Sequence, residues 1–354
     1  MKLLVIQQKM IGDVLITSIL CNNLRKAYPN AQIDYMVYKS TSAILDGNKS
    51  ISNLILFEEK YRTSKFEFLK FLIKIRKTKY DVVIDAYTKI ESFLPVIFSG
   101  AKTKISFYKK YRSLIFNKLV EKSQIPTSNL GLIIEQRLSL LKPLNLNITI
   151  DNFPVIYVSK EEEVFAENIF QKNAVNSSKK TLMLSIIGSS NDKTYPAEYM
   201  VELIETLVNK YEVNILFNYI PSQIKLADEI FELCSKAAQS KIYFNVLGKN
   251  IREFIAIMNQ CDAIIGNDGG AINIAKALNK PSFIIFSPWI DKKGWATFED
   301  GIKNVSVHLS EFKSHLFENK SAKEIYKINS ELYLEFNPDL FKLSFEKFCK
   351  NHLE

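Results

Sequence analysis

Two series of short apolar runs, each alternating with helix-type patterns, constrain the fold of this chain more than any other feature. The first series predicts strands at 3–7, 33–38, 54–57 and 81–86, with helices at 14–27 and 64–77. The pattern then lapses, and we expect mostly helix from about 108 to 154. The second series predicts strands at 181–187, 213–218, 242–248, 263–267 and 282–287, with helices near 197–210, 222–238, 251–260 and 271–278. Strand, helix and strand at this spacing indicate right-handed crossovers and parallel sheets.

The two series indicate an α/β protein built from two doubly wound, Rossmann-like domains with a cleft between them. At 354 residues the chain is longer than a single hydrophobic core usually supports. We expect a first domain over 1–165 and a second over 175–340, joined by a helix and a polar linker near 160–180. A closing helix is expected within 341–354.

The first loop of interest, QKMIGDVL at 8–15, follows the first predicted strand. Ligands of doubly wound sheets bind beyond the carboxyl ends of the strands, so loops in this position are the informative ones. Gly12 permits a tight turn, and Asp13 lies where the next helix begins. As an N-cap, Asp13 would stabilise that helix by about 1 kcal/mol. A carboxylate facing a cleft would instead serve as a general base, and both interpretations stay open at this point.

A second loop, IIGSSNDKTYP at 186–196, follows the first strand of the second series. Gly188 to Thr194 resembles a phosphate-binding loop, but the residue before Lys193 is Asp192 where that motif requires glycine, and this excludes the nucleoside triphosphatase interpretation. Gly188, Ser189 and Lys193 remain candidates for contact with a diphosphate, with an ordinary exposed lysine as the alternative.

The third loop lies within IIGNDGGAINIAKALNKPSFIIF at 264–286. Asp268 ends a strand, and Gly269 and Gly270 lead into a helix, in a chain that has only 11 glycines. Glycine lets a ligand approach the backbone, and a helix N-terminus offers free N–H groups to an anion. This combination suits a nucleoside diphosphate, with Asp268 accepting hydrogen bonds from sugar hydroxyls, although plain helix capping would use the same residues.

Composition excludes several classes of protein. Residues 60–122 hold 16 Lys and Arg against 5 Asp and Glu, although the whole chain has a net charge of only +9. Such a stretch attracts phosphate-rich partners, or it is simply a solvated face. Scattered cysteines, three late histidines and the absence of D-x-D predict no metal site. G-x-S-x-G and G-x-G-x-x-G are absent, which argues against hydrolase triads and dehydrogenases. Neither a signal peptide nor an apolar run long enough to span a bilayer is present, so we expect a cytoplasmic protein.

With these loops placed, the chain resembles the heptosyltransferase family of inverting glycosyltransferases, glycosyltransferase family 9. The resemblance runs over 11–37, 80–107, 189–200 and 247–286. It implies a GT-B architecture with an N-terminal acceptor domain, a C-terminal donor domain and a last helix, near 344–353, that packs back on the first domain. It also implies that Asp13 is the catalytic base, with Gly12 in the acceptor loop. Lys193 would contact the donor phosphate, and Asp268, Gly269 and Gly270 would hold the donor sugar and diphosphate.

Two positions depart from the family pattern. Asn273 stands where the family often has histidine, and Gln223 falls about where an acidic residue often meets the donor nucleoside. We expect both to line the donor site. They leave the identity of the donor open, although ADP-heptose is the first expectation. They also favour an alternative, a catalytically decayed protein that binds a nucleotide sugar without transferring it.

The basic stretch points to the acceptor and to the place where the protein works. The resemblance implies an acceptor in the phosphorylated, acidic inner region of lipopolysaccharide, an anionic glycolipid. The helix SKFEFLKFLIKIRK at 64–77 combines an apolar face with five cations and would rest on the inner leaflet of the membrane, although helices this apolar are more often core. Nucleic acid is not expected as a partner, because no zinc-finger or RRM signature is present.

Overall fold

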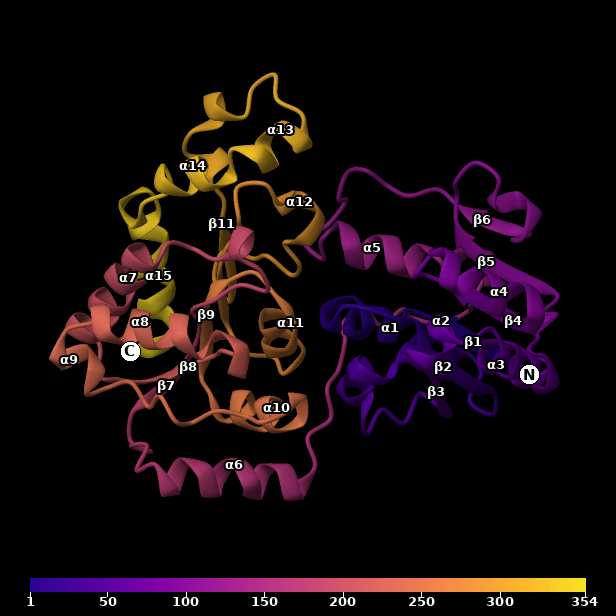
Figure 1. Ribbon diagram of the computed structural model, residues 1–354, viewed down its shortest axis with the longest axis horizontal. Coiled ribbons are helices and arrows are strands. Elements are labelled where there is room, and N and C mark those ends of the chain that lie inside the picture. The colour runs from indigo at the N-terminus through magenta and orange to yellow at the C-terminus, as the bar shows by residue number, and fades with distance from the viewer. The chain divides into compact units, whose positions relative to one another are not determined.

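The protein folds as two compact units, and the computed structural model describes residues 1–354. The first unit is Met1–Tyr157 and the second is Val158–Glu354. In Figure 1 the first is drawn in indigo to magenta and the second in magenta to yellow. The helix expected in the linker, near 160–172, belongs to the second unit. An ion pair between Glu162 of this helix and Arg252, at 2.6 Å, joins it to the rest of that unit.

The first unit is a six-stranded parallel sheet with helices on both faces. Its elements are β1 (Lys2–Ile6), α1 (Ile11–Ala27), β2 (Gln32–Tyr38), β3 (Asn53–Phe57), α2 (Lys60–Thr63), α3 (Lys65–Thr78), β4 (Val82–Asp85), α4 (Ile90–Ser99), β5 (Thr103–Phe107), β6 (Lys118–Val120) and α5 (Leu132–Ser139). The strand order is β3-β2-β1-β4-β5-β6. Helix α1 packs on one face, where the Tyr35 hydroxyl donates to the Val14 carbonyl. Helices α3 and α4 cover the other, with Phe71, Leu72 and Val96 in its core.

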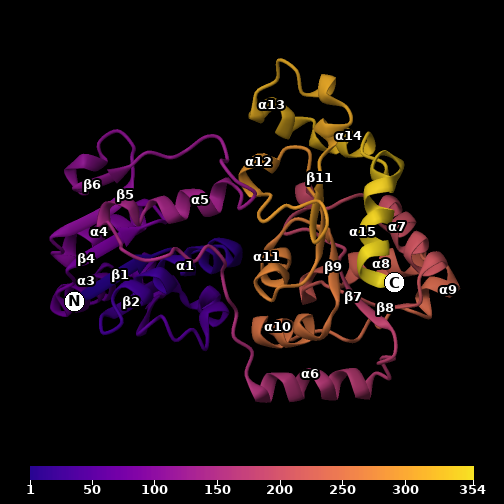
Figure 2. The same cartoon turned by 180° about the vertical axis from the view of Figure 1, so that it is seen from behind.

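The second unit has a five-stranded parallel sheet in the order β11-β10-β9-β7-β8. Its elements are α6 (Lys160–Lys172), β7 (Lys180–Ser185), α7 (Ala197–Lys210), β8 (Val213–Phe217), α8 (Ile224–Leu233), α9 (Lys236–Gln239), α10 (Ile251–Gln260), β9 (Ala263–Asn267), α11 (Gly270–Ala277), β10 (Ser282–Ile285), α12 (Lys292–Trp295), β11 (Asn304–Val307), α13 (Ala322–Lys327), α14 (Asn329–Leu334) and α15 (Lys342–Leu353). Helix α6 lies beside α10 in both views (Figures 1 and 2).

In each unit the strand order reverses at one point, and this positions the candidate site. In the first unit β1 lies between β2 and β4, and in the second β7 lies between β8 and β9. Chain connections leave the two sides of such a point in opposite directions, which opens a crevice beyond the carboxyl ends of the strands. The loops after β1 and β4, and those after β7 and β9, therefore lie at the two reversals of strand order.

Two expectations from the pattern differ from the structure. Residues 108–154 contain one α-helix, α5, and add strand β6 to the sheet; prolines at 126 and 143 help to keep the rest irregular. The expected strand at 242–248 reduces to one isolated bridge between Ile215 and Ile242. Phe244 instead packs its ring against Phe217 and Phe231.

The closing helix α15 contributes its apolar side chains to the core of the second unit. That it also packs back on the first domain stays a prediction. The rings of Phe345 and Phe348 lie 5.3 and 5.6 Å from that of Phe283 in β10. Phe345, Phe348 and Cys349 recur at helical spacing, so one side of α15 is apolar and covers the nearest bare face of its own sheet. None of the helices in the protein is both long enough and apolar enough to cross a membrane.

Candidate active site

The loop after β1 presents Asp13 in the first turn of α1, but not as the helix cap. Helix α1 begins at Ile11 and its N-cap is Met10, which makes no side-chain capping bond. Asp13 is therefore the third residue of the helix. The turn also falls on Met10, which has a φ of 63°, and not on Gly12, which is already helical. A non-glycine residue in this region is strained. The capping interpretation of Asp13 is thus wrong.

Arg137 of α5 holds the Asp13 carboxylate, although the two residues are far apart in sequence. The Arg137 Nη2 atom lies 2.9 Å from Asp13 Oδ1, and Arg137 Nε donates to the Thr17 hydroxyl at 2.9 Å. The side chains of Arg137 and Asp13 are 6% and 17% exposed. The guanidinium therefore fixes the position of the carboxylate and meets its negative charge at hydrogen-bond distance.

More charged groups border the same edge of the first sheet. Asp85, at the end of β4, is fully buried and accepts bonds from the backbone N–H groups of Tyr87 and Thr88 and from the Ser92 hydroxyl. Burial raises its pKa to about 6, against the effect of those bonds and of nearby Arg112. Burial, with the charges of Arg137 and Arg112, lowers the pKa of Lys122. This edge therefore combines two carboxylates with three cations.

In the second unit the loop after β7 folds so that Lys193 reaches Asp268. Lys193 Nζ lies 3.9 Å from Asp268 Oδ2 and 5.6 Å from the centre of the Trp289 ring. Burial raises the pKa of Asp268, while the charges of Lys193 and Lys276 oppose that rise. Burial also lowers the pKa of Lys276 to about 8, and its ammonium group donates to the Thr297 carbonyl at 2.6 Å.

Hydrogen bonds from side chains to backbone groups hold this loop in place. The Asp192 carbonyl accepts bonds from Ser287 Oγ, Trp289 Nε1 and Asn329 Nδ2 at 2.7 to 3.1 Å. Asn267 Nδ2 donates to the Ser185 carbonyl, while its Oδ1 accepts from the Tyr195 N–H. The side chain of Asn267 thereby joins the ends of β7 and β9 to the end of the loop.

Gly188 and Gly269 have different structural roles at this site. A Cβ on Gly188 would lie 2.2 Å from the Lys193 carbonyl oxygen, so this glycine lets the loop fold back on itself. A Cβ on Gly269, which caps α11, would meet no atom within 4 Å. Gly269 thus leaves open space at the start of the helix, where a ligand would lie. Gly270 is the first residue of α11, and Ser189 is exposed at the loop.

The two residues that depart from the family pattern both bond to this site. Gln223 Nε2 donates to the Gly188 carbonyl at 2.9 Å, while its Oε1 accepts from the Ile220 N–H. Asn273 Nδ2 donates to the Gly269 carbonyl at 3.1 Å. The structure therefore brings the expected donor-site residues to one edge of the second sheet, namely Gly188, Ser189, Lys193, Gln223, Asp268, Gly269, Gly270 and Asn273.

Sequence reasoning missed several residues of both sites. Arg112 and Lys122 belong to the basic stretch, which was the only signal for them. No sequence signal marked four other residues, namely Arg137, Asp85, Asn267 and Lys276. Asp85 and Asn267 lie within strands predicted as core, and the partners of Arg137 and Lys276 are distant in sequence. No three His, Cys, Asp or Glu side chains gather into a group that could hold a metal ion.

Two Rossmann-type sheets in one chain, with polar loops at both strand-order reversals, are the architecture of the GT-B class of glycosyltransferases. Solved structures agree. The E. coli ADP-heptose lipopolysaccharide heptosyltransferase II superimposes with a TM-score of 0.70 over 95% of this chain and 99% of that one, at 18% identity. The family 9 glycosyltransferase of Veillonella parvula gives 0.74 over 95% and 98%, at 16% identity. These likenesses establish the fold.

The sequence establishes the family. Residues 68–325 match the model of glycosyltransferase family 9 (heptosyltransferase). Lipopolysaccharide heptosyltransferase 1 of Campylobacter coli is 23% identical over 81% of this chain and 84% of that enzyme. Lipopolysaccharide heptosyltransferase 3 of E. coli is 25% identical over 78% of this chain and 80% of that enzyme. The chain belongs to glycosyltransferase family 9, and it is a glycosyltransferase.

Proposed function

We propose that this glycosyltransferase moves a heptose, or a related sugar, from a nucleoside diphosphate donor to a lipopolysaccharide core or a related surface glycan. The relatives named above are lipopolysaccharide heptosyltransferases, and one solved relative is described as an ADP-heptose enzyme. ADP-heptose is therefore the donor that we propose first. We further propose that the protein works in the cytoplasm at the inner membrane, where a lipid-linked acceptor would be presented.

The Asp13 carboxylate, paired with Arg137 at 2.9 Å, carries the proposal for the acceptor side. Asp13 would take the proton of the acceptor hydroxyl while that oxygen attacks the anomeric carbon. The new carbon–oxygen bond forms on the face opposite the leaving group, so the anomeric configuration inverts. Arg137 orients the carboxylate before the step, while Lys122 and Arg112 supply positive charge for phosphate or carboxylate groups of the acceptor.

Lys193 and the start of α11 carry the donor side. As the anomeric carbon–oxygen bond breaks, its electron pair passes to the departing diphosphate. The Lys193 ammonium and the free N–H groups beyond Gly269 would hold that charge, so the proposed step needs no metal ion. Asp268 would accept hydrogen bonds from sugar hydroxyls. That the two sites face each other across a cleft stays a prediction.

Incubation of the purified protein with a panel of nucleotide sugars tests this proposal. Thermal shift reports donor binding, because a ligand of the folded state raises stability by mass action. Mass spectrometry of a truncated lipopolysaccharide acceptor then reports transfer, with and without EDTA, and the anomeric proton coupling reports inversion. We expect ADP-heptose to bind and to be consumed in the presence of EDTA. Binding of a nucleotide sugar with no transfer to any acceptor would favour the alternative, a catalytically decayed protein that only binds nucleotide sugars. Asn273 and Gln223, the residues that favour this alternative, both bond to the donor site.

A further inference from the structure

The outer sides of α3 and α4 carry large apolar side chains that the protein itself leaves uncovered. On α3 these are Phe66, Leu69 and Ile73, exposed by 66%, 47% and 43%, and on α4 they are Ile90, Leu94 and Ile97, exposed by 84%, 42% and 44%. Within each helix the three recur at intervals of three or four residues, so they form one row along its outer side. We call these six residues and the lysines beside them the α3/α4 surface.

The two rows face the same way. Both helices cover the same side of the first sheet, where Leu72 of α3 and Val96 of α4 share one core, so their exposed residues point away from that sheet. The helices also pack side by side. Arg76 of α3 reaches the end of α4, so closely that a Cβ on Gly100 would lie 1.8 Å from its Nη1 atom. The rows are therefore neighbours on one face of the first unit.

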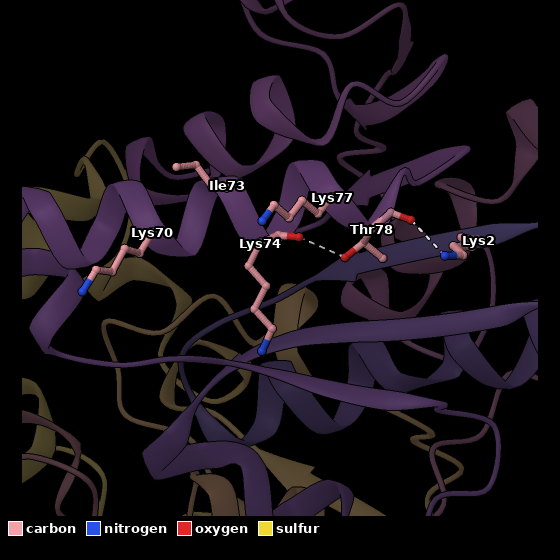
Figure 3. A pocket seen from close by; sticks show the side chains of 6 residues that line it. All are labelled: Lys2, Lys70, Ile73, Lys74, Lys77 and Thr78. Carbon is pink, nitrogen blue, oxygen red and sulfur yellow. Dashed lines mark hydrogen bonds between the residues drawn. The ribbon is translucent and has the colours of Figure 1, made fainter.

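Lysines lie beside the apolar row of α3. A hollow of about 560 Å³ beside α3 is lined by Lys2, Lys70, Ile73, Lys74, Lys77 and Thr78 (Figure 3). Lys2 donates to the Thr78 carbonyl at 3.0 Å, and Lys70 pairs with Glu67 at 2.9 Å. Lys74 and Lys77 pair with no carboxylate. This face therefore holds positive charge that the protein does not neutralise.

We propose that the α3/α4 surface docks on an anionic lipid bilayer. Uncovered apolar rows with lysines beside them match a membrane boundary, where side chains such as Phe66 enter the acyl region and ammonium groups meet lipid phosphates. A second copy of the chain is a poorer occupant, because two such lysine faces would repel each other. Nucleic acid would match the charge but would leave six apolar side chains in water.

The position of this surface fits the acceptor site of the same unit. Helix α3 runs back from the carboxyl edge of the sheet, so Phe66 lies near that edge and Thr78 near the opposite one, beside Lys2. Ile90 begins α4, just after the end of β4, at the edge where Asp13 lies. The choice of a bilayer rests on the proposed function, whose acceptor is lipid-linked. A docked first unit would hold its carboxyl edge close to the membrane surface.

Co-sedimentation of the full chain with vesicles tests the inference without any sugar transfer. We expect binding to phosphatidylcholine vesicles containing about one third phosphatidylglycerol, with weaker binding at high salt and none to phosphatidylcholine alone. The triple variant Lys70→Gln, Lys74→Gln, Lys77→Gln should bind about 100-fold more weakly, at about tenfold for each one or two lysines lost. The triple variant Phe66→Ser, Leu69→Ser, Ile73→Ser should also lose binding, with an unchanged circular dichroism spectrum.

A matched control changes the same net charge elsewhere. Lys172, Lys225 and Lys323 are exposed on the second unit and pair with no carboxylate, so their change to Gln should leave vesicle binding unaltered. Four results would each overturn the inference. The control could lose as much binding as the lysine variant, or the unchanged protein could fail to bind vesicles. The protein could also bind duplex DNA more tightly at the same salt, or form a dimer that only the serine variant breaks. Vesicle binding without sugar transfer would instead contradict the proposed function and leave this inference standing.

Discussion

The candidate sites of the two units are held together in different ways. In the first unit a side-chain ion pair does this, between Asp13 and Arg137, which are separated by 124 residues. In the second unit the Lys193 loop is held mainly through its backbone, by three donors on the Asp192 carbonyl and by the close approach that Gly188 permits. A site held by charged side chains is suited to proton transfer, and one held by backbone is suited to present fixed dipoles to a diphosphate.

The largest effect is expected at Asp13. Asp13→Asn keeps the size of the side chain and an oxygen for Arg137, but it removes the basic carboxylate. We expect kcat to fall by about 10² to 10⁴ with little change in Tm. Asp151→Asn is the matched control, since Asp151 is also ion-paired, with Lys26, in the same unit. Retention of most activity by Asp13→Asn would contradict the role of Asp13 as base.

Removal of Arg137 tests whether side chains hold the first site. Arg137→Met leaves Asp13 without its guanidinium in a nearly buried place. We expect the free energy of unfolding to fall by about 3 kcal/mol, along with a lower kcat. Arg137→Lys keeps the charge but not the two directed bonds to Asp13 and Thr17. Its free energy of unfolding and its kcat should lie between those of Arg137→Met and of the unchanged protein. Urea unfolding followed by circular dichroism, beside steady-state kinetics, measures both effects. Unchanged values in Arg137→Met would show that the ion pair does not hold the first site.

Asp85 gives the first unit a pH dependence of its own. The folded protein keeps a proton on Asp85 up to about pH 6, whereas the unfolded chain loses it near pH 4. The folded state binds more protons in this range, so the contribution of Asp85 to stability falls as pH rises from about 4 to 6, by up to about 3 kcal/mol. Asp85→Asn should lack that decline. Urea unfolding of both proteins across this range measures it, and parallel curves would count against it.

Gly269 tests the open space at the second site. Gly269→Ala adds a methyl group that meets no protein atom, so we expect Tm to stay the same. If the donor occupies that space, its KM should rise by about tenfold, which corresponds to about 1.4 kcal/mol of lost binding. Gly294→Ala, whose new methyl group would make an ordinary contact with Asp291, is the matched control. An unchanged KM would remove the donor from this position.

The smallest effect concerns Met10. Its φ of 63° is strained for a residue with a side chain, and glycine removes that strain. We expect Met10→Gly to raise the free energy of unfolding by about 1 kcal/mol. Met10→Ala keeps the strain and should give no gain. A loss of stability in the glycine variant, measured by urea unfolding, would indicate that the Met10 side chain has a structural contact of greater value.

Local patterns predicted most elements of the fold. The amphipathic helices α3, α7 and α10 and the buried strands β1, β7 and β9 follow from periodicity and β-branched content, which depend on neighbouring residues only. The run at 242–248 has the same composition as a strand, but its aromatic ring at Phe244 packs on a cluster of rings instead of extending the sheet. Composition cannot separate these outcomes, because both bury apolar side chains.

The sequence by itself determined the two parallel sheets, the loops at their carboxyl edges and the residues Asp13, Lys193 and Asp268 within those loops. Those features arise from local spacing and from the rule that parallel strands end at one edge. Only the tertiary structure decided that Arg137 pairs with Asp13, that three side chains hold the Asp192 carbonyl and that α15 covers its own sheet. These contacts join segments that are distant in the chain, and they depend on how whole elements pack, which no local pattern encodes.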